Sequence, residues 1–264
     1  MALIYLTDSQ WAEYGHQVEA IEALAEYPIG NDFFRISHGK DYFSFFRRLG
    51  FLRYCAWVER GRVAAVAAAI LRKLPGRGGA LGKAWYLCDL KVHPDFRGER
   101  IPLRMLGRAF LPNYLRCAHG YAISMDPADR PNRIAPLLAH FRWASLRAAG
   151  KLLLWSLDQK TVLKNLPLVQ KHRGPVSFLS LHGKKDIILK STGLPMSLYH
   201  LQFGPLAEQG LGEPPADSVN MFCAPDGDAL AKELIAAGLH PSSTATIISH
   251  RMQTDWKWVL TSDI

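Results

Sequence analysis

Apolar residues recur at three-to-four-residue spacing in two N-terminal stretches, and this spacing predicts helices. In residues 11–25 the apolar positions are Trp11, Tyr14, Val18, Ile21 and Leu24. Ser9 is a suitable N-cap for this helix, and the run 27–30 ends it. Residues 40–50 predict a second, short helix that is rich in aromatic side chains and closes at Gly50.

The next stretches predict a β-hairpin. Residues 51–59 form one arm, Arg60-Gly61 the turn, and residues 63–73 the other arm. The second arm is rich in alanine, so helix propensity alone favours a helix there. We predict a strand because Gly61 suits the turn and β-branched residues recur along the arm. Residues 75–82, rich in glycine, predict a flexible loop between strands.

Residues 87–109 combine a strand, a basic loop and a helix. In the strand, alternation places Leu90 and Val92 with Cys88 on one face, and Asp89 and Lys91 on the other. A proline then ends the strand pattern, and the run 97–100 (Arg-Gly-Glu-Arg) follows as a tight loop. Helical spacing begins at residue 101. Amide groups at a helix start, together with guanidinium groups, predict a site for phosphate or pyrophosphate.

The run DLKVHPDFRGERIP resembles motif A of the GNAT acyl-CoA N-acyltransferases, in which the loop binds the pyrophosphate of acyl-CoA. The matching residues are Asp89, Leu90, Val92, Pro94, Arg97, Gly98 and Ile101. The chain departs from the motif at Arg100 and Pro102, which replace two loop glycines. Arg100 adds charge and a Cβ, and Pro102 removes one amide that would face the phosphates.

A second resemblance follows the predicted strand 120–125. Asn132, Ala135 and Leu138 recur every third residue, which resembles motif B of the same family. Ala139 stands where that motif has a tyrosine, so the residue that the family uses as general acid is missing there. Pro136 also limits the helix in this segment.

The resemblance implies roles for named residues. The strand Leu90, Lys91 and Val92 would supply backbone groups to the acyl carbonyl and the pantetheine. Asp89 is the candidate base, with ion pairing to Arg53 or Lys91 as the structural alternative, and Tyr121 is a candidate substitute acid. The residues expected to bind the rest of acyl-CoA are Arg97, Gly98, Glu99, Arg100, Ile101, Pro102 and Asn132.

These patterns predict an α/β fold of the GNAT type: a mixed, mostly antiparallel sheet flanked by helices, followed by a smaller α+β part. We place the GNAT-like acyl-CoA-binding domain at residues 1–158 and the C-terminal domain at 159–264. A strand at 152–157 would complete the first domain. In the second, strands are predicted at 176–181, 186–189, 197–203, 219–224, 244–249 and 256–260, with a helix at 229–237 capped by Asp228. Up to residue 249 this order resembles a shortened second GNAT half without a motif A loop.

Composition excludes several classes of function. The net charge is +9, but the arginines are spread along the chain and no nucleic-acid motif occurs, so we expect no nucleic-acid partner. No apolar run reaches the ~18 residues of a membrane span, and the start lacks signal-peptide features. Four scattered cysteines and ten histidines without ligand spacing predict reduced thiols, no metal and a cytoplasmic location.

Two functions from different classes remain open. The first is an N-acyltransferase that uses acyl-CoA, with acetyl-CoA as the expected co-substrate, and a small amine or amino-acid-like acceptor in a ternary complex. The second is a degenerate GNAT module that binds CoA or a partner without turnover, which Arg100, Pro102 and Ala139 favour. A homodimer is compatible with either function, and the pocket walls that select the acceptor carry no motif.

Overall fold

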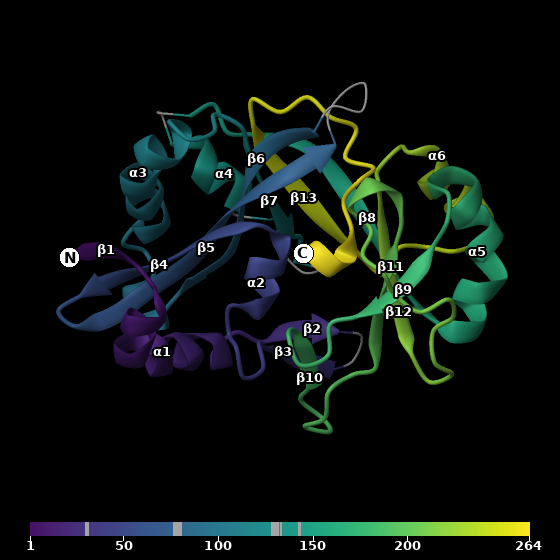
Figure 1. The fold of residues 1–264 in the computed structure, drawn as a ribbon, viewed down its shortest axis with the longest axis horizontal. Coiled ribbons are helices and arrows are strands. Elements are labelled where there is room, and N and C mark those ends of the chain that lie inside the picture. Colours follow the sequence, from purple (N-terminus) through teal and green to yellow (C-terminus); the bar gives the residue numbers. More distant parts are fainter. Residues whose placement is uncertain (30–31, 76–80, 128–131, 133, 142–143) are drawn as a thin grey trace.

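A ten-stranded mixed sheet forms the centre of the protein in a computed structural model, which describes residues 1–29, 32–75, 81–127, 132, 134–141 and 144–264 (Figure 1). In spatial order the strands are β1 (Ala2–Tyr5), β4 (Phe51–Glu59), β5 (Arg62–Pro75), β6 (Leu81–Val92), β7 (Gly120–Met125), β13 (Ser243–His250), β8 (Arg147–Asp158), β12 (Val219–Pro225), β11 (Leu198–Gln202) and β9 (Ser177–Ser180). Within this sheet the β6–β7 and β11–β12 pairs are parallel and the other described pairs are antiparallel. The predicted fold class, a mixed and mostly antiparallel sheet with flanking helices, is confirmed.

A second, three-stranded sheet joins distant parts of the chain. It contains β2 (Tyr27–Ile29), β3 (Asp32–Ser37) and β10 (Asp186–Leu189), with β3 in the middle. β3 pairs with β10 in antiparallel register, so an N-terminal strand is held by a strand from the C-terminal part. The sequence predicted β10 but neither β2 nor β3.

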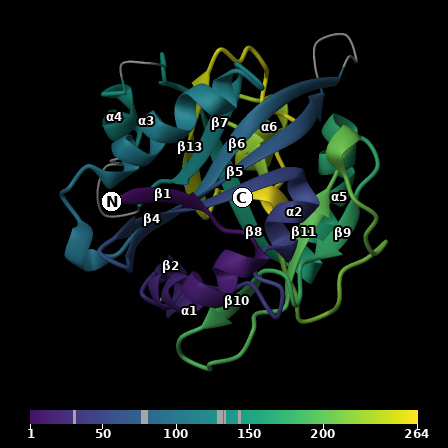
Figure 2. The ribbon, with the colours of Figure 1, turned by 60° about the vertical axis from the view of Figure 1, so that its left-hand side comes forward.

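Helices cover both faces of the large sheet. They are α1 (Asp8–Ala23), α2 (Ser44–Leu49), α3 (Ile101–Tyr114), α4 (Ile134–Ala139), α5 (Gln159–Arg173) and α6 (Ala229–Ala236), with short 3₁₀ turns at Pro94–Phe96, Gly204–Leu206 and Thr261–Asp263. Figure 2 shows α3 and α1 on opposite sides of β1 and β4. The first helix is capped by Thr7, whose capping box with Gln10 replaces the predicted Ser9 cap. In the described part of the chain, no helix combines the length and apolar character needed to cross a bilayer.

Packing explains why the alanine-rich arm is a strand. Its residues are buried on both faces: Ile101 and Met105 of α3 pack with Ala64 and Ala65 on one face, while Val66 belongs to the core under α1 and α2 on the other. Small side chains allow helices to approach both faces closely, and this burial overrides helix propensity. The hairpin and its Arg60-Gly61 turn are confirmed.

The predicted loop at 75–82 is shorter than expected. β5 runs to Pro75 and β6 begins at Leu81, so β6 starts six residues before the predicted strand at 87. The central part of the predicted loop, residues 76–80, lies outside the described residues.

The C-terminal part contains a helix, α5, that was not predicted from the sequence. α5 begins at its N-cap Asp158, whose carboxylate accepts from the backbone N–H of Thr161 at 2.8 Å. α5 and α6 pack over β8 and β12 around Trp155 and Phe222, whose rings stack at 5.3 Å. The order of strands β9 to β12, α6 and β13 matches the prediction.

A predicted strand at 256–260 is wrong. Trp256 has a positive φ of 60°, which interrupts an extended conformation, and the segment is a turn. Trp256 and Trp258 are buried against Tyr121, so burial rather than strand pairing explains the apolar run.

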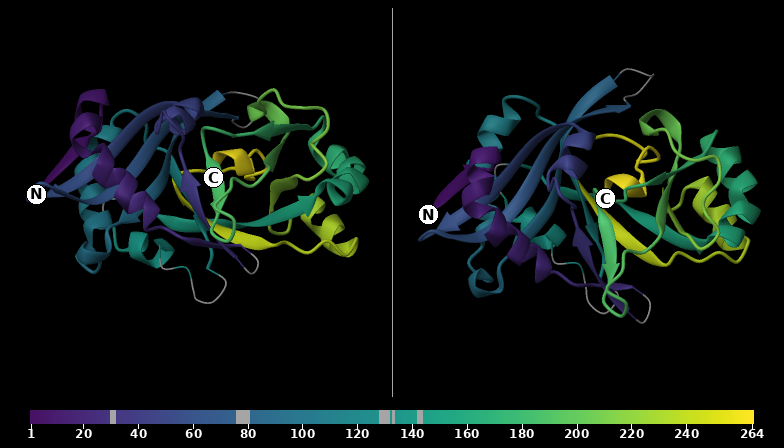
Figure 3. Two further views of the ribbon diagram at one scale, coloured as in Figure 1. Left: turned by 90° about the horizontal axis from the view of Figure 1, so that it is seen from below. Right: turned by 60° about the horizontal axis from the view of Figure 1, so that its bottom comes forward.

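The last strand connects the two parts of the chain. β13 lies between β7 and β8 and pairs with both, and Figure 3 shows it beside β8. β8, which the sequence assigned to the first domain, pairs with β13 and β12 from the C-terminal part. The division at residues 158 and 159 stays a prediction, and the sheet continues across it.

Candidate functional site

Two neighbouring strands separate at the centre of the sheet. β6 and β7 pair in parallel where Trp85–Leu87 face Gly120–Ala122, and their pairing ends there. Beyond this point β7 continues beside β13, while β6 continues beside β5. The backbone of Leu90, Lys91 and Val92 therefore lies beyond the paired part of β6 and β7, and all three residues are partly buried. Their predicted contact with the acyl group and the pantetheine stays a prediction.

A β-bulge at Asp89 interrupts β6. The pairing with β5 shifts between Val66 and Ala68, and Asp89 adopts a positive φ of 54°. The bulge changes which face each side chain occupies. Cys88 packs in the core under α1 and α2, and Asp89 and Lys91 point to the same side, whereas Val92 packs under α3.

The predicted face of Cys88 is therefore wrong, whereas Asp89 and Lys91 share a face opposite Val92 as predicted. Simple alternation placed Cys88 with Val92 and opposite Asp89, but one extra residue in a strand reverses the faces that follow it.

A cluster of ionisable side chains gathers on the α1 side of the bulge. We call it the bulge cluster, and its members are Glu22, His38, Tyr42, Tyr54, Asp89 and Lys91. They come from α1, the segment after β3, the segment before α2, and strands β4 and β6, so tertiary folding brings them together.

Lys91 links the two carboxylates of the cluster. Its Nζ lies 2.7 Å from Glu22 Oε2 and also forms an ion pair with Asp89 Oδ1. The Tyr54 hydroxyl donates to the other oxygen of Asp89 at 2.5 Å. The Tyr42 hydroxyl donates to Glu22 Oε2 at 3.1 Å and lies 3.0 Å from the Tyr54 hydroxyl. Both oxygens of Asp89 thus have a partner. On Glu22, the contacts with Tyr42 and Lys91 are both made by Oε2.

Three atoms of the cluster are left without a hydrogen bond. Among the described residues, no partner is found for Glu22 Oε1, His38 Nδ1 or His38 Nε2, all of which are buried. His38 Nε2 lies 3.9 Å from Glu22 Oε2, and the His38 residue is only 4% exposed. Buried polar atoms without partners are costly, so their presence needs a reason, such as a catalytic role or a bound water or ion.

The pKa values of the two carboxyl groups are shifted in opposite directions. Burial and the neighbouring Asp89 charge raise the pKa of Glu22 despite the opposing effect of Lys91. Burial is the largest single effect on Asp89 and favours its protonated form, but the Lys91 charge, His38 and the hydrogen bonds from Lys91 and Tyr54 together outweigh it and lower the pKa of Asp89. Burial lowers the pKa of His38 to about 4, so its imidazole is neutral at pH 7. This combination suits Glu22, with neutral His38 beside it, to proton transfer better than the predicted Asp89.

Sequence reasoning missed both Glu22 and His38. Glu22 did leave a signal, because it lies on the apolar face of α1, four residues after Val18 and seven after Gly15. An acid at that position is unusual for a solvated helix face. His38 stands alone between two elements and carries no comparable signal.

The same cluster has the donor atoms of a metal site. One ligand atom each from Glu22, His38 and Asp89 lie within 4.8 Å of one another. Lys91 already provides a cation in contact with both carboxylates, so the charge that a metal would compensate is balanced by the chain itself. The expectation of no metal stays a prediction.

The basic loop lies at the start of α3. Gly98 and Arg100 have φ values of 88° and 56°, and Arg100 is the N-cap, so the arginine adopts the left-handed conformation that glycine would adopt more easily. Pro102 is in the first helical turn. Arg97, Gly98, Glu99 and Arg100 are exposed, while Ile101 is buried under the helix.

The backbone amides of this loop have no acceptor in the described structure. These amides are the N–H groups of Gly98, Glu99, Arg100 and Ile101. Free amides at a helix start, beside two exposed guanidinium groups, form a favourable environment for an anion. Arg100 thus adopts the left-handed conformation that suits the glycine of the motif. Pro102, which replaces the other glycine, lies in the first helical turn, where a helix tolerates proline.

Tyr121 has surroundings unlike those expected of a general acid. Its hydroxyl accepts from Arg72 at 3.1 Å, its ring stacks on Tyr86 at 4.8 Å, and only 2% of the residue is exposed. Burial raises the pKa of Tyr121. A general acid must reach the leaving group, whereas this hydroxyl is enclosed beside the Arg72–Asp263 ion pair.

Asn132 joins the end of β7 to α4. Its amide donates to Asp126 Oδ1 at 2.9 Å and to Ser124 Oγ at 3.1 Å, and its oxygen accepts from the N–H of Ile134 at 2.9 Å. These contacts fix the strand end and the start of the helix, and the predicted contact with acyl-CoA stays a prediction. Ala139 ends α4 and its side chain lies outside what the structure describes.

Sequence comparison with known proteins finds a distant relative. No protein-family model matches the chain. An uncharacterised protein of Acanthamoeba polyphaga mimivirus is 26% identical over 241 residues, which cover 85% of this chain and 68% of that protein.

Comparison with solved structures finds similar folds. A tandem GNAT protein from the clavulanic acid biosynthesis pathway superposes with a TM-score of 0.53 at 10% identity, covering 96% of this chain and 99% of that one. A GCN5-related N-acetyltransferase from Anabaena variabilis gives a TM-score of 0.48 at 11% identity, covering 94% of this chain and 72% of that one. The first of these matches shares its fold with the present chain over almost its whole length.

Proposed function

We propose that this chain, which has the GNAT fold in a tandem arrangement, transfers an acyl group from acyl-CoA to the amine of a small molecule. The observation that carries the proposal is the opening between β6 and β7 beyond Leu87, next to the Arg97 loop and the start of α3. A parallel pair that separates in this way offers unpaired backbone groups beside an anion-binding helix start.

Residues of the loop and of β6 would hold the co-substrate. Arg97 and Arg100, with the amides from Gly98 to Ile101, suit the pyrophosphate. The backbone of residues 90–92 suits the amides of the pantetheine arm. The bound thioester supplies the activated acyl group, and acetyl-CoA is the form we expect.

Glu22 is the residue that we propose as base. Its raised pKa and its free Oε1 suit removal of a proton from the acceptor ammonium, with His38 beside it. The amine nitrogen then bonds to the acyl carbon, the carbon–sulfur bond breaks, and the thiolate takes a proton on release. Asp89 and Lys91 act as positioning residues, because their ion pair holds the second oxygen of Glu22 in place.

A second candidate is a module that binds CoA without turnover. It is favoured by the absence of a hydroxyl at Ala139 and by the burial of the bulge cluster, in which Glu22 and His38 are less than a tenth exposed. Both candidates use the same loop for CoA, so binding and turnover must be measured separately.

Binding is tested by isothermal titration with acetyl-CoA and CoA. We expect Arg97→Ala to weaken binding about tenfold, because one charge-assisted contact with the pyrophosphate is lost. Arg147→Ala is the matched control, since it removes an equally exposed arginine from β8. Equal effects of the two substitutions, or no binding by the unchanged protein, would exclude both candidates.

Turnover is tested by following thiol release from acetyl-CoA with a panel of small amines. We expect Glu22→Gln to lower kcat by about 10²–10⁴-fold while the Kd for acetyl-CoA stays constant. Binding without thiol release for any amine would favour the second candidate. The cytoplasmic location, the identity of the acceptor and a homodimer stay predictions.

A further inference from the structure

A pocket with a volume of about 430 Å³ lies at the other end of β5 and β6. It forms where β4 begins at Phe51 opposite Leu71, so that β5 continues past its neighbour. Lys83 on its wall precedes Asp89 by six residues along β6, a separation of about 20 Å at the rise of a strand. The pocket is therefore separate from the bulge cluster.

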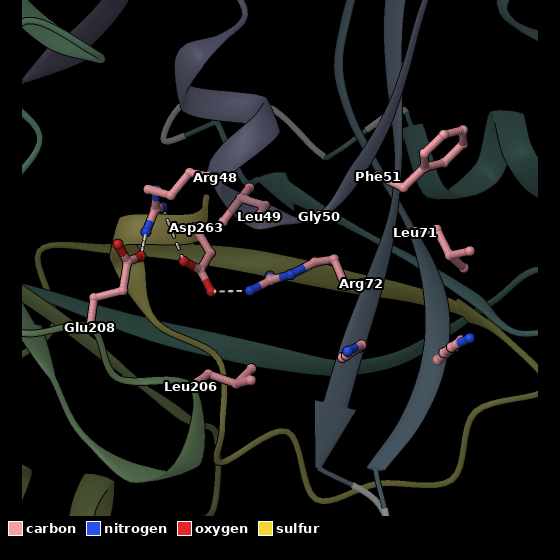
Figure 4. A pocket seen from close by; sticks show the side chains of 11 residues that line it. Arg48, Leu49, Gly50, Phe51, Leu71, Arg72, Leu206, Glu208 and Asp263 are labelled. Carbon is pink, nitrogen blue, oxygen red and sulfur yellow. Dashed lines mark hydrogen bonds and ion pairs between the residues drawn. The ribbon is translucent and has the colours of Figure 1, made fainter.

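One side of the pocket is a closed network of ion pairs. Asp263 forms ion pairs with Arg72 at 2.7 Å and with Arg48 at 3.2 Å, and Arg48 also pairs with Glu208. Figure 4 shows these four side chains converging on one side, with Phe51 and Leu71 on the other. Both acidic residues of the lining are thus already occupied by the two arginines.

The other side carries the positive charges of Lys73 and Lys83, which are both exposed to solvent. Lys73 and Lys83 stand directly opposite each other in the β5–β6 register, an arrangement that destabilises a sheet because the charges repel. For neither lysine is an acidic partner found within ion-pair distance in the part of the chain that the structure describes. Arg116 lies outside the pocket lining, with its guanidinium 4.3 Å from the centre of the Phe51 ring.

An apolar surface adjoins these charges. Leu71 and Lys73 are two residues apart on β5, so they share one face of the sheet, and Phe51 faces Leu71 across the strands. Phe51 remains 48% exposed. Cations beside an exposed aromatic ring, in a pocket large enough for a small molecule, match a ligand with one anionic group and an apolar body.

We propose that this pocket binds a small organic anion, a phosphate monoester or carboxylate, with its charge at Lys73 and Lys83 and its apolar part against Phe51 and Leu71. This site goes beyond the proposed acyl transfer and uses none of its residues.

The test is isothermal titration of the full chain with phenyl phosphate, before and after a double substitution Lys73→Gln and Lys83→Gln. We expect saturable binding that the double variant weakens at least about tenfold. The control replaces the exposed Lys160 and Lys232 by glutamine, which removes the same net charge elsewhere and should leave binding unchanged. The pocket variant should fold, because the substitution removes a repulsive pair.

Other outcomes overturn the proposal. Absence of saturation, or an equal loss in both double variants, would exclude a built anion site. Inorganic phosphate binding as tightly as phenyl phosphate would exclude a role for the apolar wall. Displacement by CoA, or loss of binding in Arg97→Ala, would place phenyl phosphate at the α3 loop instead. Because that loop is tested separately, failure of this site leaves the acyltransferase proposal intact.

Discussion

Lys91 is the one ammonium group in contact with two buried carboxylates, those of Glu22 and Asp89, in the described part of the bulge cluster. Removing such charges from water is costly, and breaking one partner leaves an uncompensated charge. Neutral His38 beside them adds polar atoms without partners. The lowered pKa of Asp89 and the raised pKa of Lys91 show that the fold favours this charged pair, whereas the raised pKa of Glu22 and the lowered pKa of His38 show that burial disfavours their charged forms. At the scale of single residues, Glu22 and His38 are therefore the members of the cluster that cost stability, which is typical of groups kept for chemistry.

The pH dependence of stability should reveal His38. Unfolded histidine binds a proton near pH ~6.5, whereas burial delays protonation of His38 in the fold to a pKa of about 4. Its contribution is therefore fully present above pH ~6.5 and is lost as the pH falls toward 4, by at most about 3 kcal/mol. Between pH ~7 and ~4.5 the free energy of unfolding, measured in urea, should fall less in His38→Gln than in the unchanged protein. We expect the difference to be about 2 kcal/mol.

Two other histidines serve as references for this measurement. Burial lowers the pKa of His200 to about 3, so His200→Gln should also flatten the pH profile. The control is His16→Gln, which replaces an exposed histidine of α1. An unchanged pH profile in His38→Gln would contradict the view that His38 is neutral and buried.

At the scale of elements, the bulge in β6 decides what the strand presents to each face. Without it, Asp89 and Lys91 would point toward α3, away from Glu22. The turn that follows β3 is equally specific, because Gly39 approaches Gly183 in the turn before β10 so closely that a Cβ would overlap its carbonyl oxygen. This contact places His38, the preceding residue, beside the sheet.

Substitution of Gly39 should therefore cost more than substitution of another glycine with the same backbone conformation. Gly39 and Gly61 have φ values of 65° and 76°, but a Cβ at Gly61 would meet open space. We expect Gly61→Ala to cost about 1 kcal/mol, for left-handed strain alone, and Gly39→Ala about 2–4 kcal/mol. Urea unfolding measures both, and equal costs would mean that the Gly39–Gly183 contact relaxes freely.

At the scale of the whole molecule, β13 makes the two parts interdependent. It fills the position between β7 and β8, and one core cluster contains residues of β4, β5, β8, β12 and β13. Two parts that share a strand and a core should unfold together, although the chain order suggests two domains.

Ile247→Ala tests this coupling. Ile247 lies on β13 with no exposed surface, so its truncation should cost about 3 kcal/mol. We expect hydrogen exchange to accelerate by the same factor in β5 and in β12, because both belong to one cooperative unit. The control Ile235→Ala, at a residue of α6 that is 40% exposed, should cost less than about 1 kcal/mol. Acceleration confined to β5 or to β12 would indicate two independent domains.

Several features followed from the sequence alone. Periodicity identified the β4–β5 hairpin, β6, α3 and the C-terminal strands, because strand alternation and helix starts depend on residues that are neighbours in the sequence. The Arg97 loop and its resemblance to motif A pointed to the fold that the tandem GNAT structure shares. α5 was missed although Asp158 and the apolar positions at Val162 and Val169 mark it.

The tertiary structure decided the rest. The bulge at Asp89, the place of β13 and the meeting of Glu22 and His38 with Lys91 depend on contacts between residues distant in the chain. No local pattern encodes such contacts, since a strand's faces follow from its register and a side chain's pKa follows from what buries it. The sequence thus determined the elements and the loop of this protein, and packing between them determined which side chains form its candidate site.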